Sequence, residues 1–279
     1  MIRIGSSGYS YEDWKKHFYP PNIKPADMLT FYAQYFDLVE INTSFYNIPP
    51  RQMLEHIREK VPNTFEFIVK VYKGITYDQA GKTPEETQHY IDEFNDAIST
   101  LVEHNMLSCL LLQFPYTFKY DEDNKNYLLS LKEKFPVPLV IEFRNVEWIN
   151  EEIFLFLEKN NIGYCCVDEP KIRGLVPPVA RVTSEIGYLR FHGRNPQNWF
   201  HPPTPADRYD YLYTEEELME WVPKIKAMAD ASKKFFVLFN NHPRGQAVKN
   251  AAMLSKLLEL KEINLPDEKD YDPGLGKFM

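Results

Sequence analysis

The chain has 279 residues, of which 44% are hydrophobic and 15% aromatic, and its formal net charge is −8. This composition supplies a large core and excludes an intrinsically disordered chain, while the negative charge weighs against general binding of nucleic acid. The first residues, MIRIGSSGYS, lack the apolar run of a signal peptide, and no stretch approaches the roughly 20 apolar residues of a membrane helix. We therefore expect a cytoplasmic protein without a membrane partner.

Eight short, mostly apolar segments have the composition of strands that are buried on both faces of a parallel sheet. They are residues 2–5, 38–42, 65–71, 107–114, 138–143, 162–167, 187–191 and 235–240. Helical patterns separate most of them, at about 26–36, 50–61, 122–134, 150–160 and 244–261. Two further helices are predicted, one that begins at a capping box of Thr83 with Glu86 and one that begins at Thr214.

This alternation, with no linker midway, predicts a single-domain (β/α)8 barrel, the TIM barrel. The alternative is a doubly wound open sheet, but "GSSG" after the first strand lacks the G-x-G-x-x-G spacing of a dinucleotide site. Segment 169–186 contains prolines and no helical period, so the barrel is expected to be irregular around its sixth helix. We expect the barrel to occupy residues 1–262 and a tail to occupy 263–279.

Three long connections follow strands, at about 6–25, 169–186 and 193–213. In a barrel all three lie on the C-terminal face, where the active sites of this fold form. The first and third are rich in aromatic residues. These rings either form a hydrophobic plug beneath the loops or line a lid that stacks on a sugar or a base.

Polar residues enter the apolar segments near their C-terminal ends, which converge on one cavity in a barrel. In PLVIEFRN (138–145), Glu142 and Arg144 have a spacing of two, so they face the same side and need partners there. From such positions the predicted catalytic residues are Glu142, Lys70, Glu40, His192 and Asp168. The predicted substrate-binding residues are Arg144, Asn42, Gln113, Arg190, Arg194, Asn240, Asn241 and Arg244. Structural ion pairs inside the barrel, such as Glu142–Lys70 or Glu40–Arg190, are the competing interpretation.

Seven segments resemble, in order, the sequence blocks of the DUF72 (YecE-like) family. They are GSSGYSYEDWKKHFYP, FDLVEINTSFYNIPP, FEFIVK, LLLQFPYTF, VIEFRNVEW, YLRFHGRN and FNNHPRGQAVKNA, and they extend from about residue 3 to 255. The resemblance implies a TIM barrel in a bacterial or archaeal cytoplasmic protein, and no particular activity. Two positions depart from the family pattern: Tyr77 stands where a His often follows "IT", and His242 stands where an acidic or small residue is common.

The residues favour an enzyme that uses general acid–base chemistry on a small polar or anionic substrate, such as a sugar or a phosphate compound. Glu142 is the predicted base, and Arg144 either orients it or clamps an anion. Lys70 and Glu40 form a possible second charged pair, and His192 is a candidate proton shuttle. The NNHPRG turn is a candidate phosphate site through Arg244 and helix N–H groups.

Several alternatives stay open. Basic residues and rings at one mouth also suit a nucleic-acid lesion, a single strand or repair-type phosphodiester chemistry, which the net charge disfavours. Lys70 would form a Schiff base if its pKa were depressed, but nearby carboxylates are expected to keep it charged. A metal site would draw on Glu142, Asp168, His192 and His242. However, no metal-ligand spacing supports it, so no cofactor is expected. Nothing in the sequence excludes a barrel that binds a ligand without catalysis. The sequence also leaves the oligomeric state undefined.

The three cysteines, Cys109, Cys165 and Cys166, all lie in strand-like segments. Their spacing is not that of zinc ligands. We therefore expect buried, reduced thiols.

Overall fold

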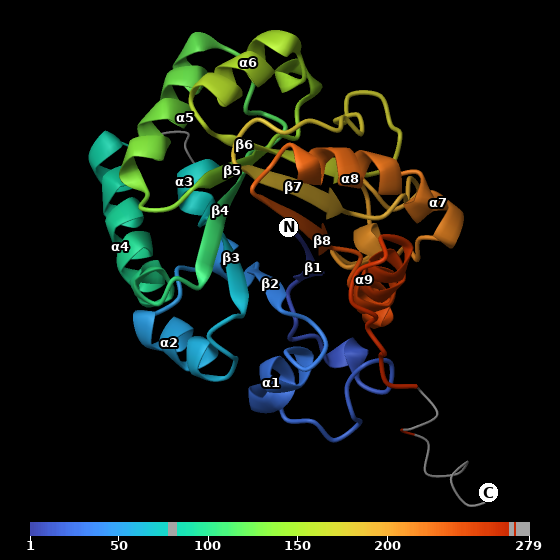
Figure 1. The fold of residues 1–279 in the computed structure, drawn as a ribbon. Coiled ribbons are helices and arrows are strands. Elements are labelled where there is room, and N and C mark those ends of the chain that lie inside the picture. The colour runs from blue at the N-terminus through green and yellow to red at the C-terminus, as the bar shows by residue number, and fades with distance from the viewer. Residues whose placement is uncertain (78–82, 268–270, 272–279) are drawn as a thin grey trace, which may run out of the picture.

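The structure is a computed structural model that describes residues 1–77, 83–267 and 271. Within these residues, eight parallel strands form a closed barrel in sequence order, and the last strand pairs with the first. The strands are β1 (Ile2–Ser7), β2 (Leu38–Ile41), β3 (Glu66–Lys70), β4 (Leu107–Gln113), β5 (Leu139–Glu142), β6 (Gly163–Asp168), β7 (Ile186–Phe191) and β8 (Lys234–Phe239). Figure 1 looks along the barrel. The predicted (β/α)8 fold is confirmed.

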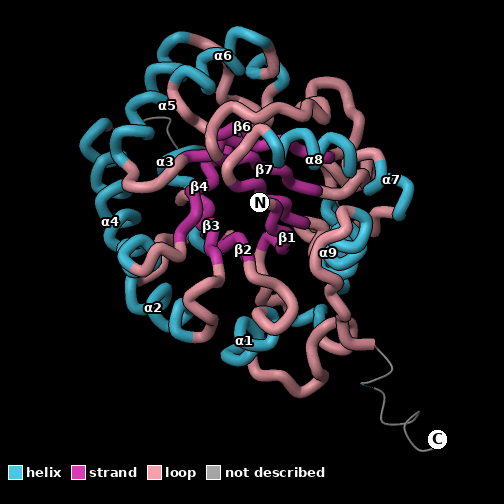
Figure 2. Tube along the Cα trace, viewed as in Figure 1, coloured by secondary structure: helices cyan, strands magenta, loops and turns pink. Residues whose placement is uncertain are grey.

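Helices surround the barrel as an outer layer (Figure 2). Those in the described ranges are α1 (Met28–Tyr32), α2 (Arg51–Glu59), α3 (Lys73–Thr76), α4 (Pro84–Glu103), α5 (Glu122–Lys134), α6 (Glu151–Lys159), α7 (Glu215–Met219), α8 (Val222–Asp230) and α9 (Gln246–Leu257). The predicted capping box is present at the start of α4, and the helix predicted to begin at Thr214 starts with a second capping box, at α7. Helix α1 is shorter than the predicted segment 26–36. The single turn of α3 was not predicted, because four residues are too few to show a helical period.

The connection between β6 and β7 contains no helix over residues 169–185, all of which the structure describes. The sixth helix of an ideal barrel, which would follow β6, is therefore missing. This confirms the irregularity predicted at that position. At the other end of the chain, Ile263 and Leu265 pack against the main core. The tail boundary at residue 263 stays a prediction, since most of the segment after 267 lies outside the described residues.

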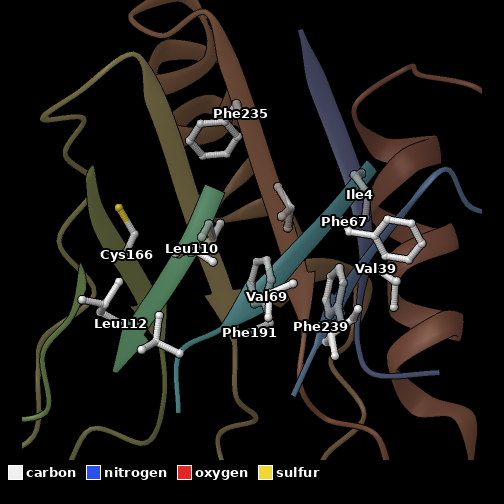
Figure 3. Close-up of a cluster of buried hydrophobic side chains, with 14 of the residues drawn as sticks. Ile4, Val39, Phe67, Val69, Leu110, Leu112, Cys166, Phe191, Phe235 and Phe239 are labelled. Carbon is white, nitrogen blue, oxygen red and sulfur yellow. The ribbon is translucent and has the colours of Figure 1, made fainter. Parts of the chain in front are cut away.

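Each strand separates two hydrophobic layers. Side chains of one parity point outward and pack beneath the helices, among them Val39, Phe67, Val69, Leu110 and Phe239 (Figure 3). Side chains of the other parity fill the barrel interior: Leu38, Ile68, Cys109, Leu111, Val140, Cys165, Val167, Tyr188, Phe236 and Leu238. The three cysteines are buried and free, as predicted. Because the interior is filled with side chains, any site on the barrel axis is confined to the mouth.

In the described part of the chain, no helix combines the length and hydrophobicity that crossing a membrane requires.

Candidate functional site

The alternation of side chains along the strands places a polar layer directly above the apolar interior. In β5, Val140 belongs to the interior, and Glu142, two residues later, lies on the same face. The same spacing places Glu40 after Leu38, Lys70 after Ile68, Gln113 after Leu111, Arg190 after Tyr188 and Asn240 after Leu238. These buried polar residues therefore meet at the C-terminal end of the barrel, as predicted from the strand-end pattern.

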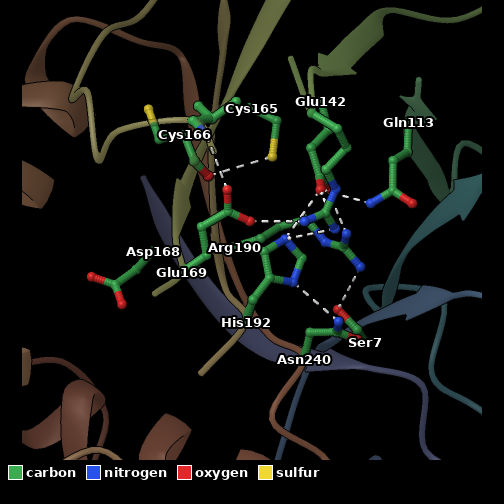
Figure 4. A network of polar contacts seen from close by, with 12 residues as sticks. Ser7, Gln113, Glu142, Cys165, Cys166, Asp168, Glu169, Arg190, His192 and Asn240 are labelled. Atoms are coloured by element: carbon green, nitrogen blue, oxygen red, sulfur yellow. Dashed lines mark hydrogen bonds and ion pairs between the residues drawn. The ribbon is translucent and has the colours of Figure 1, made fainter. Parts of the chain in front are cut away.

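Glu142 is the centre of this polar layer (Figure 4). Its Oε1 accepts hydrogen bonds from Gln113 Nε2 at 2.6 Å and His192 Nε2 at 3.1 Å, and it lies 2.8 Å from Arg144 Nη2. Its Oε2 accepts from Arg190 Nη1 at 2.6 Å. The side chain is fully buried, so these four residues supply its polar surroundings.

The electrostatics of Glu142 do not suit a general base. Burial raises its pKa, but the guanidinium groups of Arg144 and Arg190 outweigh burial and hold the pKa well below its usual range. A carboxylate with so low a pKa is a poor proton acceptor near neutral pH. This arrangement favours Glu142 as an anchor for the two arginines over the predicted role as a base.

Arg190 links Glu142 to the far side of the barrel. Its Nη2 donates to Glu40 Oε1 at 2.6 Å and to Ser7 Oγ at 3.3 Å. The other oxygen of Glu40 accepts from the Tyr188 hydroxyl at 2.6 Å. The Glu40–Arg190 ion pair considered from the sequence is therefore present, and it lies fully inside the barrel.

Lys70 does not form the considered ion pair with Glu142, because Gln113 lies between them. Lys70 Nζ donates to Gln113 Oε1 at 2.8 Å and lies 4.0 Å from the centre of the Phe45 ring. Burial, followed by the nearby charge of Arg190, lowers the pKa of Lys70 to about 7. Burial and Arg190 outweigh Glu142 and Glu40, so these carboxylates hold less of the Lys70 charge at neutral pH than the sequence led us to expect.

His192 is fully buried between two polar partners. Its Nδ1 lies 3.1 Å from Asn240 Nδ2, and its Nε2 lies 3.1 Å from Glu142 Oε1. Because the Asn240 amide is a donor, these partners assign the ring proton to Nε2. Burial lowers the pKa of His192 to about 3, so the ring is neutral near pH 7. These surroundings suit a residue that orients Glu142. They suit a proton shuttle less well.

Asp168 lies outside this network. It follows the interior residue Val167, so it has the opposite parity and faces the helices. Its carboxylate accepts from Arg194 at 2.9 and 2.8 Å, from the Tyr213 hydroxyl at 2.7 Å and from Trp221 Nε1 at 2.7 Å. In Figure 4 its carboxylate points away from the other polar side chains. The surroundings of Asp168 are those of a structural anchor.

Arg194, a predicted substrate-binding residue two positions after His192, pairs with Asp168 and does not join the network around Glu142. The reason is Gly193, whose φ of 92° ends the strand geometry directly after His192. A spacing of two therefore no longer keeps residues on one face beyond that point.

Two predicted asparagines also lie apart from the network. Asn241 Nδ2 donates to the Tyr211 carbonyl and to Asn250 Oδ1, both at 2.8 Å, and so ties the loop before α7 to α9. Asn42 lines a separate cavity of about 220 Å³ beside Tyr11 and Met53. The structure does not bring these two residues to Glu142.

Arg244 lies at the predicted phosphate turn, but carboxylates surround it. Its Nη2 lies 2.5 Å from Asp210 Oδ1, and its backbone N–H donates to Asp13 Oδ2 at 2.7 Å. Two negative charges next to this turn oppose the binding of a phosphate there.

A cavity of about 210 Å³ opens at the mouth beside the polar layer. Its walls come from Gln113, the last residue of β4, and from the connections after β3 to β7, which contribute Tyr77, Pro115, Tyr116, Arg144, Leu175, Trp199, Phe200, Arg208 and Tyr209. Gln113 and Arg144 are thus the predicted site residues that reach its wall. The wall also contains Tyr77, whose hydroxyl donates to Gln113 Oε1 at 3.1 Å.

The two ring-rich loops have different roles. In the first loop, Trp14, Phe18 and Tyr19 are fully buried, so these rings form the hydrophobic plug. In the third loop, Trp199 and Tyr209 line the mouth cavity, which agrees with the alternative of a ring-lined lid.

The sequence patterns did not identify two charged residues at this cavity. Arg208 follows no strand pattern. Its guanidinium lies 5.9 Å from the Trp199 ring, and its buried Nε has no hydrogen-bond partner among the described residues. Glu169 comes one residue after β6, and its Oε2 lies 2.8 Å from Arg144 Nη1. Burial raises the pKa of Glu169 to about 7. The ring-rich composition around Arg208 was the available signal for the first of these residues.

The residues considered for a metal are not gathered at one point. His242 stacks on Tyr11, with ring centres 4.4 Å apart, and Asp168 faces the helices. Over the ranges that the structure describes, no three His, Cys, Asp or Glu side chains are grouped in a way that could hold a metal ion.

Residues 3–273 match the family described as protein of unknown function DUF72. The chain is 34% identical over 277 residues to the UPF0759 protein YunF of Bacillus subtilis (strain 168), a match that covers 95% of this chain and 97% of that protein. A DUF72 family structure from Thermotoga maritima MSB8 has 38% identity and a TM-score of 0.85, and it covers 93% of this chain and 99% of its own. Another from Enterococcus faecalis V583 has 30% identity, a TM-score of 0.82 and coverages of 95% and 99%. The chain therefore belongs to the DUF72 family.

Proposed function

We propose that the chain is an enzyme that performs general acid–base chemistry on a small anionic substrate bound in the mouth cavity. The observation that carries this proposal is Arg208, a guanidinium in the cavity wall without an ion-pair partner among the described residues. The charge of Arg144 in the same wall is already shared by Glu142 and Glu169. Arg208 is therefore the cation available to a carboxylate or phosphate, which guanidinium groups bind in a bidentate manner.

Two groups behind the cavity wall suit proton transfer near neutral pH. Lys70 contacts the wall residue Gln113, and Glu169 contacts the wall residue Arg144. Both have a pKa of about 7, Lys70 because burial lowers it and Glu169 because burial raises it. Groups whose pKa lies near the working pH are the most effective general acids and bases. We assign Lys70 as the proton acceptor and Glu169 as the proton donor.

The size and walls of the cavity limit the substrate. Its volume of about 210 Å³ is below the roughly 300–1,000 Å³ that is common for ligand pockets, so the substrate is small. Trp199 and Tyr209 offer ring faces on which a sugar or a planar group can pack. We further propose that the protein acts in the cytoplasm, because its three free cysteines fit a reducing compartment.

The experiment is a turnover screen with a defined mixture of small phosphorylated and carboxylated sugars and acids, followed by proton NMR. We expect the wild type to consume at least one compound, Arg208→Gln to raise its KM, and Lys70→Met to abolish turnover. Arg51→Gln is the matched control, because Arg51 is a half-buried arginine that pairs with Glu103 away from the mouth. If no compound is consumed, or if Arg208→Gln behaves as the control does, the proposal fails. Salt-sensitive retention on single-stranded DNA that depends on Arg208 would instead favour the nucleic-acid alternative.

A further inference from the structure

Lys70 has surroundings that differ from those of a structural lysine. It lies at the C-terminal end of β3 on the interior face of the barrel and is only 8% exposed. A buried lysine usually pairs with a carboxylate, but among the described residues no carboxylate pairs with Lys70. Its ammonium position is instead held by the neutral Gln113 amide, at 2.8 Å, and by the face of the Phe45 ring, at 4.0 Å.

Only the side chain of Gln113, to which the Lys70 amine is hydrogen-bonded, separates that amine from the mouth cavity. Gln113 lines the cavity, and its Oε1 accepts from both Lys70 and the wall residue Tyr77. A ligand atom that displaces Gln113 Oε1 would therefore meet Nζ directly. Arg208 in the same wall provides positive charge for an anionic group of that ligand.

We propose that Lys70 is a nucleophile that forms an imine with the carbonyl group of a small anionic aldehyde or ketone. This inference rests on the proposed function and names the substrate class of the same site. It differs from that proposal in that Lys70 bonds to the substrate covalently, whereas proton transfer alone would leave the substrate free.

The reaction balances without an oxidant or a reductant. The Nζ lone pair attacks the carbonyl carbon, the C–N bond forms, and the carbonyl oxygen takes the proton that nitrogen releases. The resulting hydroxyl leaves as water with one proton from solvent, and the C=N bond forms as a cationic imine. The ring face of Phe45 and the Oε1 of Gln113 already surround the cationic ammonium, so they also suit this cation.

The electrostatics of the site agree with this role. Burial lowers the pKa of Lys70 to about 7, so a large share of the amine is unprotonated at neutral pH. Only the unprotonated amine attacks a carbonyl, and desolvation is one of the recognised means of activating a lysine for imine formation.

The test is reductive trapping with glyoxylate and cyanoborohydride at pH 7, with peptide mass spectrometry to locate the modified lysines. Glyoxylate is a two-carbon anionic aldehyde, so the size of the cavity does not exclude it. Hydride from cyanoborohydride converts the imine into a stable secondary amine. The unprotonated share of Lys70 at pH 7 is on the order of a thousand times that of a lysine with an ordinary pKa, so we expect Lys70 to be modified at least about tenfold faster than an exposed lysine although it is buried. Lys233, which is on the surface, is the internal reference.

Arg208→Gln is expected to slow the modification of Lys70 several-fold while leaving that of Lys233 unchanged. Added inorganic phosphate should compete with glyoxylate for Arg208, so it should also slow the modification of Lys70 and leave that of Lys233 unchanged. Modification of Lys70 at the rate of Lys233 or slower in the wild type overturns the imine proposal, and this readout needs no variant to fold.

The two proposals fail separately. If the turnover screen finds an Arg208-dependent substrate but Lys70 is not trapped, the imine is wrong and Lys70 remains the assigned proton acceptor. If Lys70 is trapped but no compound is consumed and Arg208→Gln has no effect, the lysine is nucleophilic and the proposed enzymatic function is wrong.

Discussion

Glu142 illustrates how one buried residue organises the mouth of the barrel. It contacts two guanidinium groups, one amide and one imidazole, and it has no exposed surface. Removing one member of a buried charge network leaves the remaining charges without compensation, which is more costly than the net stabilisation that the network provides. The role of Glu142 as an anchor therefore has a direct consequence for stability.

We expect Glu142→Ala to lower the free energy of unfolding by about 3–5 kcal/mol, because Arg190 and Arg144 lose a shared buried partner. Urea denaturation measures this change. The control is Glu185→Ala, which breaks the exposed Glu185–Lys233 pair and should cost less than about 1 kcal/mol. A similar loss in both variants would contradict the buried network.

Lys70 should make stability depend on pH in a defined direction. Its pKa is about 7 in the folded chain against an ordinary value of 10.5, so between these values the unfolded chain binds more protons. Stability therefore rises with pH over this window, by up to about 1.4 kcal/mol per pH unit from this one group. In Lys70→Met this rise is absent, which urea denaturation between pH 7 and pH 9.5 can detect. Parallel pH profiles of the two proteins would show that folded Lys70 has an ordinary pKa.

The limits of prediction are also visible at single residues. The strand-end pattern identified Glu142, Arg190 and Lys70, because a period of two on an apolar strand fixes the face of each side chain. The same rule places Asp168 on the helix side, but only once the structure has shown that Val167 lies in the barrel interior. Arg208 and Glu169 were not identified, because loops without a period bring them to the cavity.

At the scale of elements, the eight strands were predictable because each combines a short apolar run with a polar end. The positions of the loops were not, since they depend on backbone conformations that hydrophobicity does not encode. Gly193 is an example. Its φ of 92° turns the chain out of β7, and an added Cβ would lie 2.8 Å from Tyr211 Cβ.

We expect Gly193→Ala to destabilise the chain more than Gly174→Ala does. Both glycines have a positive φ, of 92° and 93°, so both variants carry a similar backbone strain of about 1–2 kcal/mol. At Gly174 the nearest atom to an added Cβ is the Tyr116 hydroxyl at 3.5 Å, which is ordinary contact. At Gly193 the contact with Tyr211 adds a further cost of about 1–3 kcal/mol. Thermal or urea unfolding of the two variants measures the difference, and equal losses would show that the Tyr211 contact relaxes.

At the scale of the whole molecule, the polar layer and the loops connect distant parts of the barrel. Ser7, Glu40, Glu142 and Arg190 join strands β1, β2, β5 and β7 through charged hydrogen bonds. Trp14 Nε1 donates to the His242 carbonyl at 2.6 Å and so links the first loop to the last. These contacts span the barrel and favour a single cooperative unit.

We therefore expect one unfolding transition for the barrel. The buried residues Trp14, Trp148 and Trp221 lie in different sectors and report by fluorescence, while far-UV circular dichroism reports the helices. In urea the two signals should give the same midpoint, as two-state unfolding requires. Separate midpoints would show that part of the barrel unfolds independently.

The central claim is that the mouth of the barrel holds a lysine that loses its proton near neutral pH. The most direct measurement is an NMR titration of the chain with isotope-labelled lysine, with Lys70 assigned by the loss of its signal in Lys70→Met. The account predicts one lysine signal that titrates near pH 7 and is absent from the variant. If every lysine titrates near the ordinary value of about 10.4, Lys70 is charged at neutral pH, and both its assigned roles are contradicted.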